Sequence, residues 1–192
     1  MMIIIKKKFK ISFFFSILLI LIFILNAKAS DQEDQLNKLF NQLKESRNNI
    51  AAQEVEKKIW EIWSTHPNNA KFTKRLAEGS ELVRNKKLSK AVNIFTEVIN
   101  LDPEWAEAWN KRATVLYMLG DFKASQKDID EVLKLEKRHF GALAGQGLVN
   151  IELKNYEKAI MSYKKAQEIY PSMQSPSIMI KQIEKLIKQD LI

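Results

Sequence analysis

The chain has 192 residues, no cysteine and a formal net charge of +8 at pH 7. The lack of cysteine excludes a disulfide framework and a thiolate metal site. Only five glycines and four prolines are present, and no alternating strand pattern competes, so the composition favours helices joined by short loops.

Residues 1–29 have the three parts of a secretory leader. Lysines precede an apolar run over residues 11–25, and alanines follow at the two positions that a signal peptidase reads. We expect cleavage before Ser30 and a periplasmic protein with no membrane segment after cleavage. The alternative is an uncleaved inner-membrane anchor, although a 15-residue helix reaches only about 22 Å of the roughly 30 Å hydrocarbon core.

The leader also accounts for most of the positive charge. It holds five of the 31 Lys and Arg residues and none of the 23 Asp and Glu residues, so the rest of the chain carries a net charge of +3. Basic residues are scattered among acidic ones there, without a long run. This pattern is typical of solvated helix faces, and we expect no nucleic-acid partner.

Residues 30–71 predict a helical hairpin. Ser30 and Glu33 fit a capping box at the start of the first helix. Apolar residues recur at helical spacing in both helices: Leu36, Leu39, Phe40, Leu43, Val55, Ile59, Ile62 and Trp63. We interpret the pair as a degenerate N-terminal unit that packs on residues 72–105, because Trp60 and Trp63 favour packing; a mobile arm that docks elsewhere is the alternative.

Residues 72–173 repeat with a period of 34 residues. One column holds small residues and another holds large ones: Gly79, Ala113 and Gly147, then Phe95, Ile129 and Tyr163. Two helices approach closely where a small side chain faces a large one, so the columns are two halves of one packing contact. The period predicts three helix-turn-helix units, at 72–105, 106–139 and 140–173.

The central unit, with Trp109, Ala113 and the turn Gly120-Asp121-Phe122, resembles a tetratricopeptide repeat (TPR). The outer units depart from the family pattern, because Arg75 and Leu143 stand where an aromatic residue is usual. The resemblance implies an all-α fold, a right-handed superhelix or α-solenoid of helix-turn-helix units. It does not name a function, since this fold hosts many roles.

Residues 174–192 predict a capping helix. Ser175 and Pro176 supply an N-cap and a first-turn proline. An apolar stripe follows at Met179, Ile183, Leu186 and Ile187. Such a helix covers the open core at the end of a solenoid.

Candidates for catalysis are weak. The two histidines, His66 and His139, lie beside helix ends and lack the spacing of paired metal ligands. We interpret His139 as a capping or surface residue. We interpret Asp128, Asp130 and Glu131 as an exposed helix face rather than a calcium site. We interpret Gly141, Gly145 and Gly147 as positions of close helix packing rather than a phosphate site. No enzyme activity, cofactor or metal is expected.

The resemblance places the first helices of successive units along a concave groove. The stripe not used for packing is mixed in character: Leu76, Ser80, Arg84, Asn110, Thr114, Tyr117, Met118, Leu148 and Ile151. Methionine, aromatic and polar groups together suit an extended or helical peptide. The alternative is that these residues pack against the terminal hairpin or the cap.

Chaperone-binding members of the family hold a C-terminal carboxylate with Lys, Asn and Arg at fixed positions on these first helices. The matching positions here are Leu76, Ser80, Lys111, Gly141 and Gly145, so a chaperone tail is not the expected ligand. We expect a non-catalytic periplasmic adaptor for a protein or peptide. The alternative is a structural protein that self-associates through its ends, at Trp60 and Trp63 or at Met179 and Ile183.

Overall fold

The structure is a computed structural model that describes residues 30–46 and 48–190, so the predicted leader lies outside the described residues. A helix over residues 30–45 comes first. The others follow in chain order: α2 (Asn49–Trp63), α3 (Ala70–Arg84), α4 (Leu88–Leu101), α5 (Ala106–Met118), α6 (Phe122–Leu135), α7 (Phe140–Glu152), α8 (Tyr156–Ile169) and α9 (Gln174–Asp190). None of these described helices is long and apolar enough to cross a bilayer.

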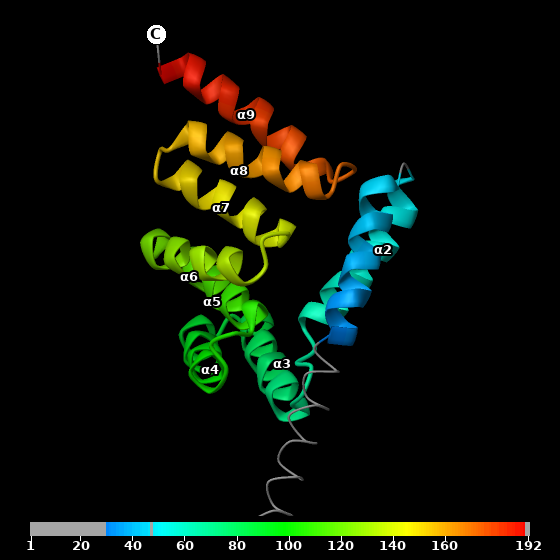
Figure 1. Cartoon of the computed structure of the whole chain (residues 1–192). Coiled ribbons are helices and arrows are strands. Elements are labelled where there is room, and N and C mark those ends of the chain that lie inside the picture. The colour runs from blue at the N-terminus through cyan, green and yellow to red at the C-terminus, as the bar shows by residue number, and fades with distance from the viewer. Residues whose placement is uncertain (1–29, 47, 191–192) are drawn as a thin grey trace, which may run out of the picture.

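Helices α3 to α9 form one continuous stack, in which each helix packs on the next (Figure 1). The pairs α3–α4, α5–α6 and α7–α8 are the three repeating hairpins, and the first helices of neighbouring pairs also touch, α3 with α5 and α5 with α7. This arrangement confirms the predicted all-α solenoid of helix-turn-helix units.

The small and large columns make the contact within each hairpin. A Cβ atom added to Gly79 would lie 2.4 Å from the Phe95 ring, and one added to Gly147 would lie 2.5 Å from the Tyr163 ring. The turn of the central hairpin closes through Gly120 at φ +80°, in the left-handed region that glycine adopts without strain. Short-range steric fit therefore sets the hairpin geometry.

The C-terminal helix caps the stack, but it begins at Gln174, slightly before the predicted N-cap at Ser175. Ile183 is buried in a cluster with Ala159 and Tyr163, and Met179 packs against that cluster. Leu186 is 39% exposed and does not belong to the packed stripe, contrary to the prediction.

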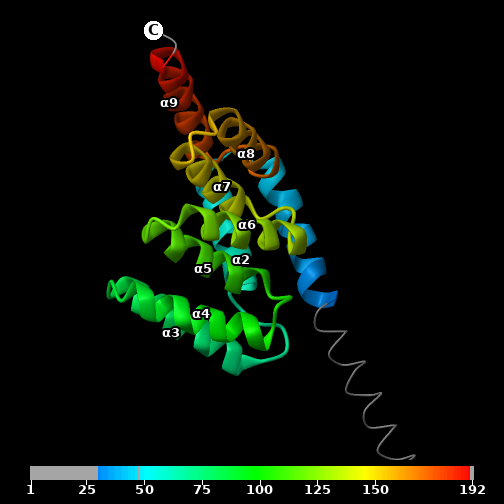
Figure 2. The same cartoon turned by 90° about the vertical axis from the view of Figure 1, so that its left-hand side faces the viewer.

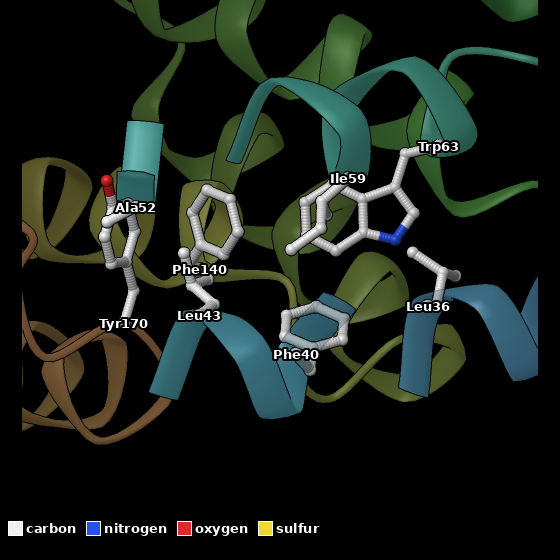
Figure 3. Close-up of a cluster of buried hydrophobic side chains, with 8 residues drawn as sticks. All are labelled: Leu36, Phe40, Leu43, Ala52, Ile59, Trp63, Phe140 and Tyr170. Carbon is white, nitrogen blue, oxygen red and sulfur yellow. The ribbon is translucent and has the colours of Figure 1, made fainter. Parts of the chain in front are cut away.

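The N-terminal hairpin, residues 30–63, forms as predicted but does not stack on α3 and α4. Its apolar residues share a core with Phe140 at the start of α7 and with Tyr170 at the end of α8 (Figure 3). In Figure 1, α2 runs beside the stack and across the ends of its helices. The predicted packing on residues 72–105 was therefore wrong: the hairpin packs as a unit with a buried core, but on the start of α7 and the end of α8.

Polar contacts tie this hairpin and the segment after it to the turns between successive units. Trp105 Nε1 donates a hydrogen bond of 2.9 Å to the Trp63 carbonyl, and His66 Nε2 lies 2.7 Å from Asp102 Oδ2. Further along, the Tyr170 hydroxyl donates to Glu56 Oε2 at 3.1 Å. The hairpin thus lies beside the stack and adds contacts to the turns after α4 and after α8 (Figure 2).

Candidate functional site

The N-terminal hairpin closes the part of the concave face where α5 and α7 begin. A Cβ atom on Gly141 would lie 2.5 Å from Trp60 Cη2, so only glycine fits beneath this ring. Trp63 stacks on His139, with ring centroids 3.9 Å apart and planes within 7°. Gly141 therefore lets α2 approach α7 closely. Gly147 instead lets α8 approach α7, through the contact with Tyr163.

Beneath the two tryptophans lies a buried pair, Glu107 and His139, whose side chains have no solvent exposure. His139 Nδ1 accepts the backbone N–H of Ala142 at 3.0 Å, which caps α7. The proton must then be on Nε2, which donates to Glu107 Oε2 at 3.1 Å. The sequence predicted a histidine at the C-terminal end of the preceding helix or on the surface; instead His139 is buried and caps the N-terminus of the following helix, α7.

Charge balance explains why Glu107 can be buried. Burial alone would raise the pKa of Glu107, but the hydrogen bond from His139 and the positive charge of Lys111 outweigh it and hold the pKa below its usual value. The Lys111 ammonium lies 3.0 Å from Glu107 Oε1, outside good hydrogen-bond geometry, and 5.8 Å from the centre of the Trp60 ring. The Glu107 and His139 side chains are sealed from solvent, the Lys111 side chain is 32% exposed, and the cluster serves to attach the hairpin.

The positions that match the carboxylate-binding residues of chaperone-binding TPR domains cannot hold a carboxylate here. Lys111 is paired with Glu107, and Gly141 lies under Trp60. Gly145 has no side chain to offer a charge. This half of the concave face lacks a free cation at the matching positions among the described residues.

The other half of the concave face stays open as a cleft of about 70 Å³ between α5 and α7. Four predicted residues line it: Asn110, Thr114, Tyr117 and Leu148. Ser125 and Ile129 of α6, with Gly141 and Gly145 of α7, also belong to its lining. Leu148 in this lining is 36% exposed, whereas Met118 at the end of α5 is 51% exposed and does not line the cleft. The structure therefore gathers part of the predicted groove into one place.

Tyr117 supplies the polar group of this cleft. Its hydroxyl donates a long hydrogen bond of 3.4 Å to Glu152 Oε1, and its ring packs on Phe122 with centroids 5.4 Å apart. Partial burial and the neighbouring Glu152 raise the pKa of Tyr117, so the phenol is protonated at neutral pH. A ligand carbonyl can compete for this donor because the existing bond is long.

The remaining predicted residues lie elsewhere. Leu76 is 2% exposed in the core of the first unit, and the Ser80 hydroxyl donates to the Leu76 carbonyl. Arg84 is exposed and pairs with Glu81. Ile151 packs against the cluster around Ile183. The first unit therefore adds nothing to the cleft, and the predicted groove is shorter than its sequence stripe.

One further prediction was wrong on the opposite, convex side. Asp128 was expected on an exposed face, yet it is 4% exposed and accepts a two-pronged hydrogen bond from Arg112, at 2.7 and 2.8 Å. No group of His, Asp and Glu residues placed to hold a metal ion occurs in the described part of the chain.

Fold and groove together define an α-solenoid of the TPR class. Residues 76–124 and 111–173 match the tetratricopeptide repeat family, and these segments make up just over half of the chain. The chain therefore belongs to this family.

Three similar proteins place the chain within the family. It is 31% identical to a TPR repeat-containing protein of Rhizobium etli over 77% of this chain and 71% of that protein. It is 28% identical to Hsp70-Hsp90 organizing protein 1 of Glycine max over half of this chain but only 17% of that protein. The first TPR of Spaghetti (RPAP3) bound to the HSP90 peptide SRMEEVD superposes with a TM-score of 0.60 at 18% identity, over 62% of this chain and 94% of that one.

Proposed function

We propose that this protein is a non-catalytic adaptor that binds a peptide segment of a partner protein in the open half of its concave face. The observation that carries the proposal is the cleft between α5 and α7, which the N-terminal hairpin leaves uncovered. Solved TPR domains of similar fold hold peptides, as the complex of the Spaghetti domain with an HSP90 peptide illustrates.

The ligand should differ from the acidic tail in that complex. Thr114 and Tyr117 offer neutral hydroxyl groups and Leu148 offers apolar surface, whereas Asn110 is buried and its Nδ2 already donates to Glu107. Such a surface suits a segment with one or two apolar anchors and an exposed backbone, rather than a terminal carboxylate. The leader predicted at residues 1–29 supports a periplasmic partner, and the periplasmic location is part of the proposal.

Self-association through the chain ends has less support. Trp63 and Ile183 are buried, Trp60 covers Gly141, and Met179 of α9 packs on the cluster that contains Ala159 and Tyr163. The side chains named for this alternative therefore make contacts within the chain, although Ile50, Ile178 and Leu186 are exposed near the ends.

The test uses Gly145, whose added Cβ would only touch Ile129 at an ordinary 3.7 Å. A photoreactive residue at Thr114 in intact cells should crosslink one partner, and Gly145→Leu, which projects a side chain into the cleft, should abolish that crosslink. Gly145→Ala is the matched control and should keep it. Equal crosslinking in the Leu and Ala variants would remove the groove assignment.

A further inference from the structure

The convex face carries a polar pocket between α6 and α8 that the proposed function does not use. Its volume of about 380 Å³ falls in the range of roughly 300–1,000 Å³ that small-molecule sites occupy. Residues from three helices line it: Asp130, Gln146, Asn150, Lys158, Ser162 and Lys165.

The repeat explains why a pocket exists at this place. One unit earlier, Arg112 fills the corresponding space. Its guanidinium makes a bidentate pair with Asp128 and donates a hydrogen bond of 3.0 Å to the Thr96 hydroxyl. Thirty-four residues later the chain has Gln146 in place of Arg112 and Ser162 in place of Asp128. A glutamine is too short to fill the space of a guanidinium bridge, so the second inter-unit junction stays open toward solvent where the first is closed.

The pocket is lined by side-chain amides with unused hydrogen-bonding atoms. Asn150 and Ser162 are buried. Ser162 Oγ donates to Gln146 Oε1 at 2.9 Å, and Asn150 Nδ2 donates to the Gln146 carbonyl at 2.8 Å. Within residues 30–46 and 48–190, Gln146 Nε2 and Asn150 Oδ1 have no hydrogen-bond partner. A donor and an acceptor side by side match hydroxyl groups, each of which donates and accepts.

The charge of the pocket favours an anion. Lys158 and Lys165 line it from α8, and neither takes part in an ion pair of the described residues. Asp130 is the one acidic residue in the lining, and it already accepts from Gln126 at 2.8 Å. A carboxylate beside the lysines would be held by charge-assisted hydrogen bonds.

From this combination we infer that the convex pocket binds a sugar acid, a small ligand with one carboxylate and several hydroxyl groups. The lysines take the carboxylate, and Gln146 and Asn150 take neighbouring hydroxyls. Met161 and Leu153 give the pocket an apolar edge for the ring C–H groups.

The test titrates the isolated protein with D-glucuronate and follows backbone amide resonances. Saturable shifts confined to α6, α7 and α8 are expected, with binding at least about tenfold weaker for acetate, which lacks hydroxyls, and for D-glucose, which lacks the charge. No saturable binding of glucuronate would overturn the inference. Equal binding of acetate or of glucose would overturn it as well, because one half of the recognition would then be absent.

Two variants locate the site. Lys165→Ala should weaken glucuronate binding about tenfold, while Lys164→Ala, at the exposed neighbouring position, should leave it unchanged. The double variant Gln146→Arg/Ser162→Asp rebuilds the ion pair of the preceding junction and should abolish binding without lowering the thermal midpoint. Undiminished glucuronate binding in Lys165→Ala, or any saturable binding in the folded double variant, would refute the assignment. Gly145→Leu should not affect it, which separates this pocket from the concave cleft.

Discussion

Replacement of His139 by alanine tests how the N-terminal hairpin is attached. The substitution removes three contacts at once: the cap on the Ala142 N–H at 3.0 Å, the hydrogen bond to Glu107 at 3.1 Å and the stacking with Trp63 at 3.9 Å. Glu107 stays buried and keeps only Lys111 and the hydrogen bond from Asn110 Nδ2 at 3.0 Å. The hairpin loses its central contact with α7.

The magnitude follows from these three losses. A missing N-cap costs about 1 kcal/mol, a buried carboxylate that loses one of its hydrogen-bond donors about 1–3 kcal/mol and an aromatic pair about 0.5–1.5 kcal/mol. The contacts share one imidazole ring and are not independent, so we expect a loss of about 3–4 kcal/mol in the free energy of unfolding. That is a large part of the roughly 5–15 kcal/mol that holds a typical domain together.

Equilibrium unfolding in urea, followed by tryptophan fluorescence and circular dichroism, measures the loss. His66→Ala is the matched control, because His66 also accepts backbone N–H groups, from Asn68 and Asn69, and faces a carboxylate, Asp102. Asp102 is partly exposed and stays hydrated, so the control should cost only about 1–2 kcal/mol.

A double-mutant cycle separates the buried charge from the other terms. Glu107→Gln should be destabilising in the wild-type protein but markedly less so in His139→Ala, since the amide carries no charge. Equal losses for the two histidine variants, together with additive effects of Glu107→Gln and His139→Ala, would refute the reasoning that burial of Glu107 dominates.

Three further predictions concern the stack. Arg112→Ala leaves Asp128 buried without its partner and should cost about 3 kcal/mol in urea unfolding, whereas Arg75→Ala, which breaks exposed pairs, should cost under about 1 kcal/mol. Gly147→Ala forces a Cβ atom to within 2.5 Å of the Tyr163 ring and should lower stability by about 1–3 kcal/mol, although alanine favours helices. Burial raises the pKa of Tyr163 and of Tyr170 to about 12. The stability that these phenols contribute should therefore be complete below their unfolded pKa near 10 and should fall as pH rises from about 10 to about 12, with phenolate absorbance rising as the protein unfolds. Phenols that titrate near pH 10 in the folded protein would contradict this prediction.

Part of the candidate site was predictable from sequence because the first helices of a repeat hairpin present one stripe to the concave side. Four residues of the predicted stripe line the cleft, Asn110, Thr114, Tyr117 and Leu148, and their part in binding stays a prediction. It could not show that Leu76 turns into the core, because the small rotations of a helix against its neighbours decide which edge of a stripe is covered. The sequence shows Gly141 and Gly145 as part of a glycine motif. It does not show that Trp60 lies against Gly141 or that both glycines line the cleft, because these neighbours come from other helices.

The sequence by itself determined the repeating stack, because the contact between a small and a large side chain, as at Gly147 and Tyr163, recurs every 34 residues and involves helices adjacent in the chain. Only the tertiary structure decided where the N-terminal hairpin lies. Its tryptophans meet His139 and Gly141 about 80 residues away, and no periodic pattern encodes a contact that occurs once. That single contact divides the concave face into a closed half and an open half.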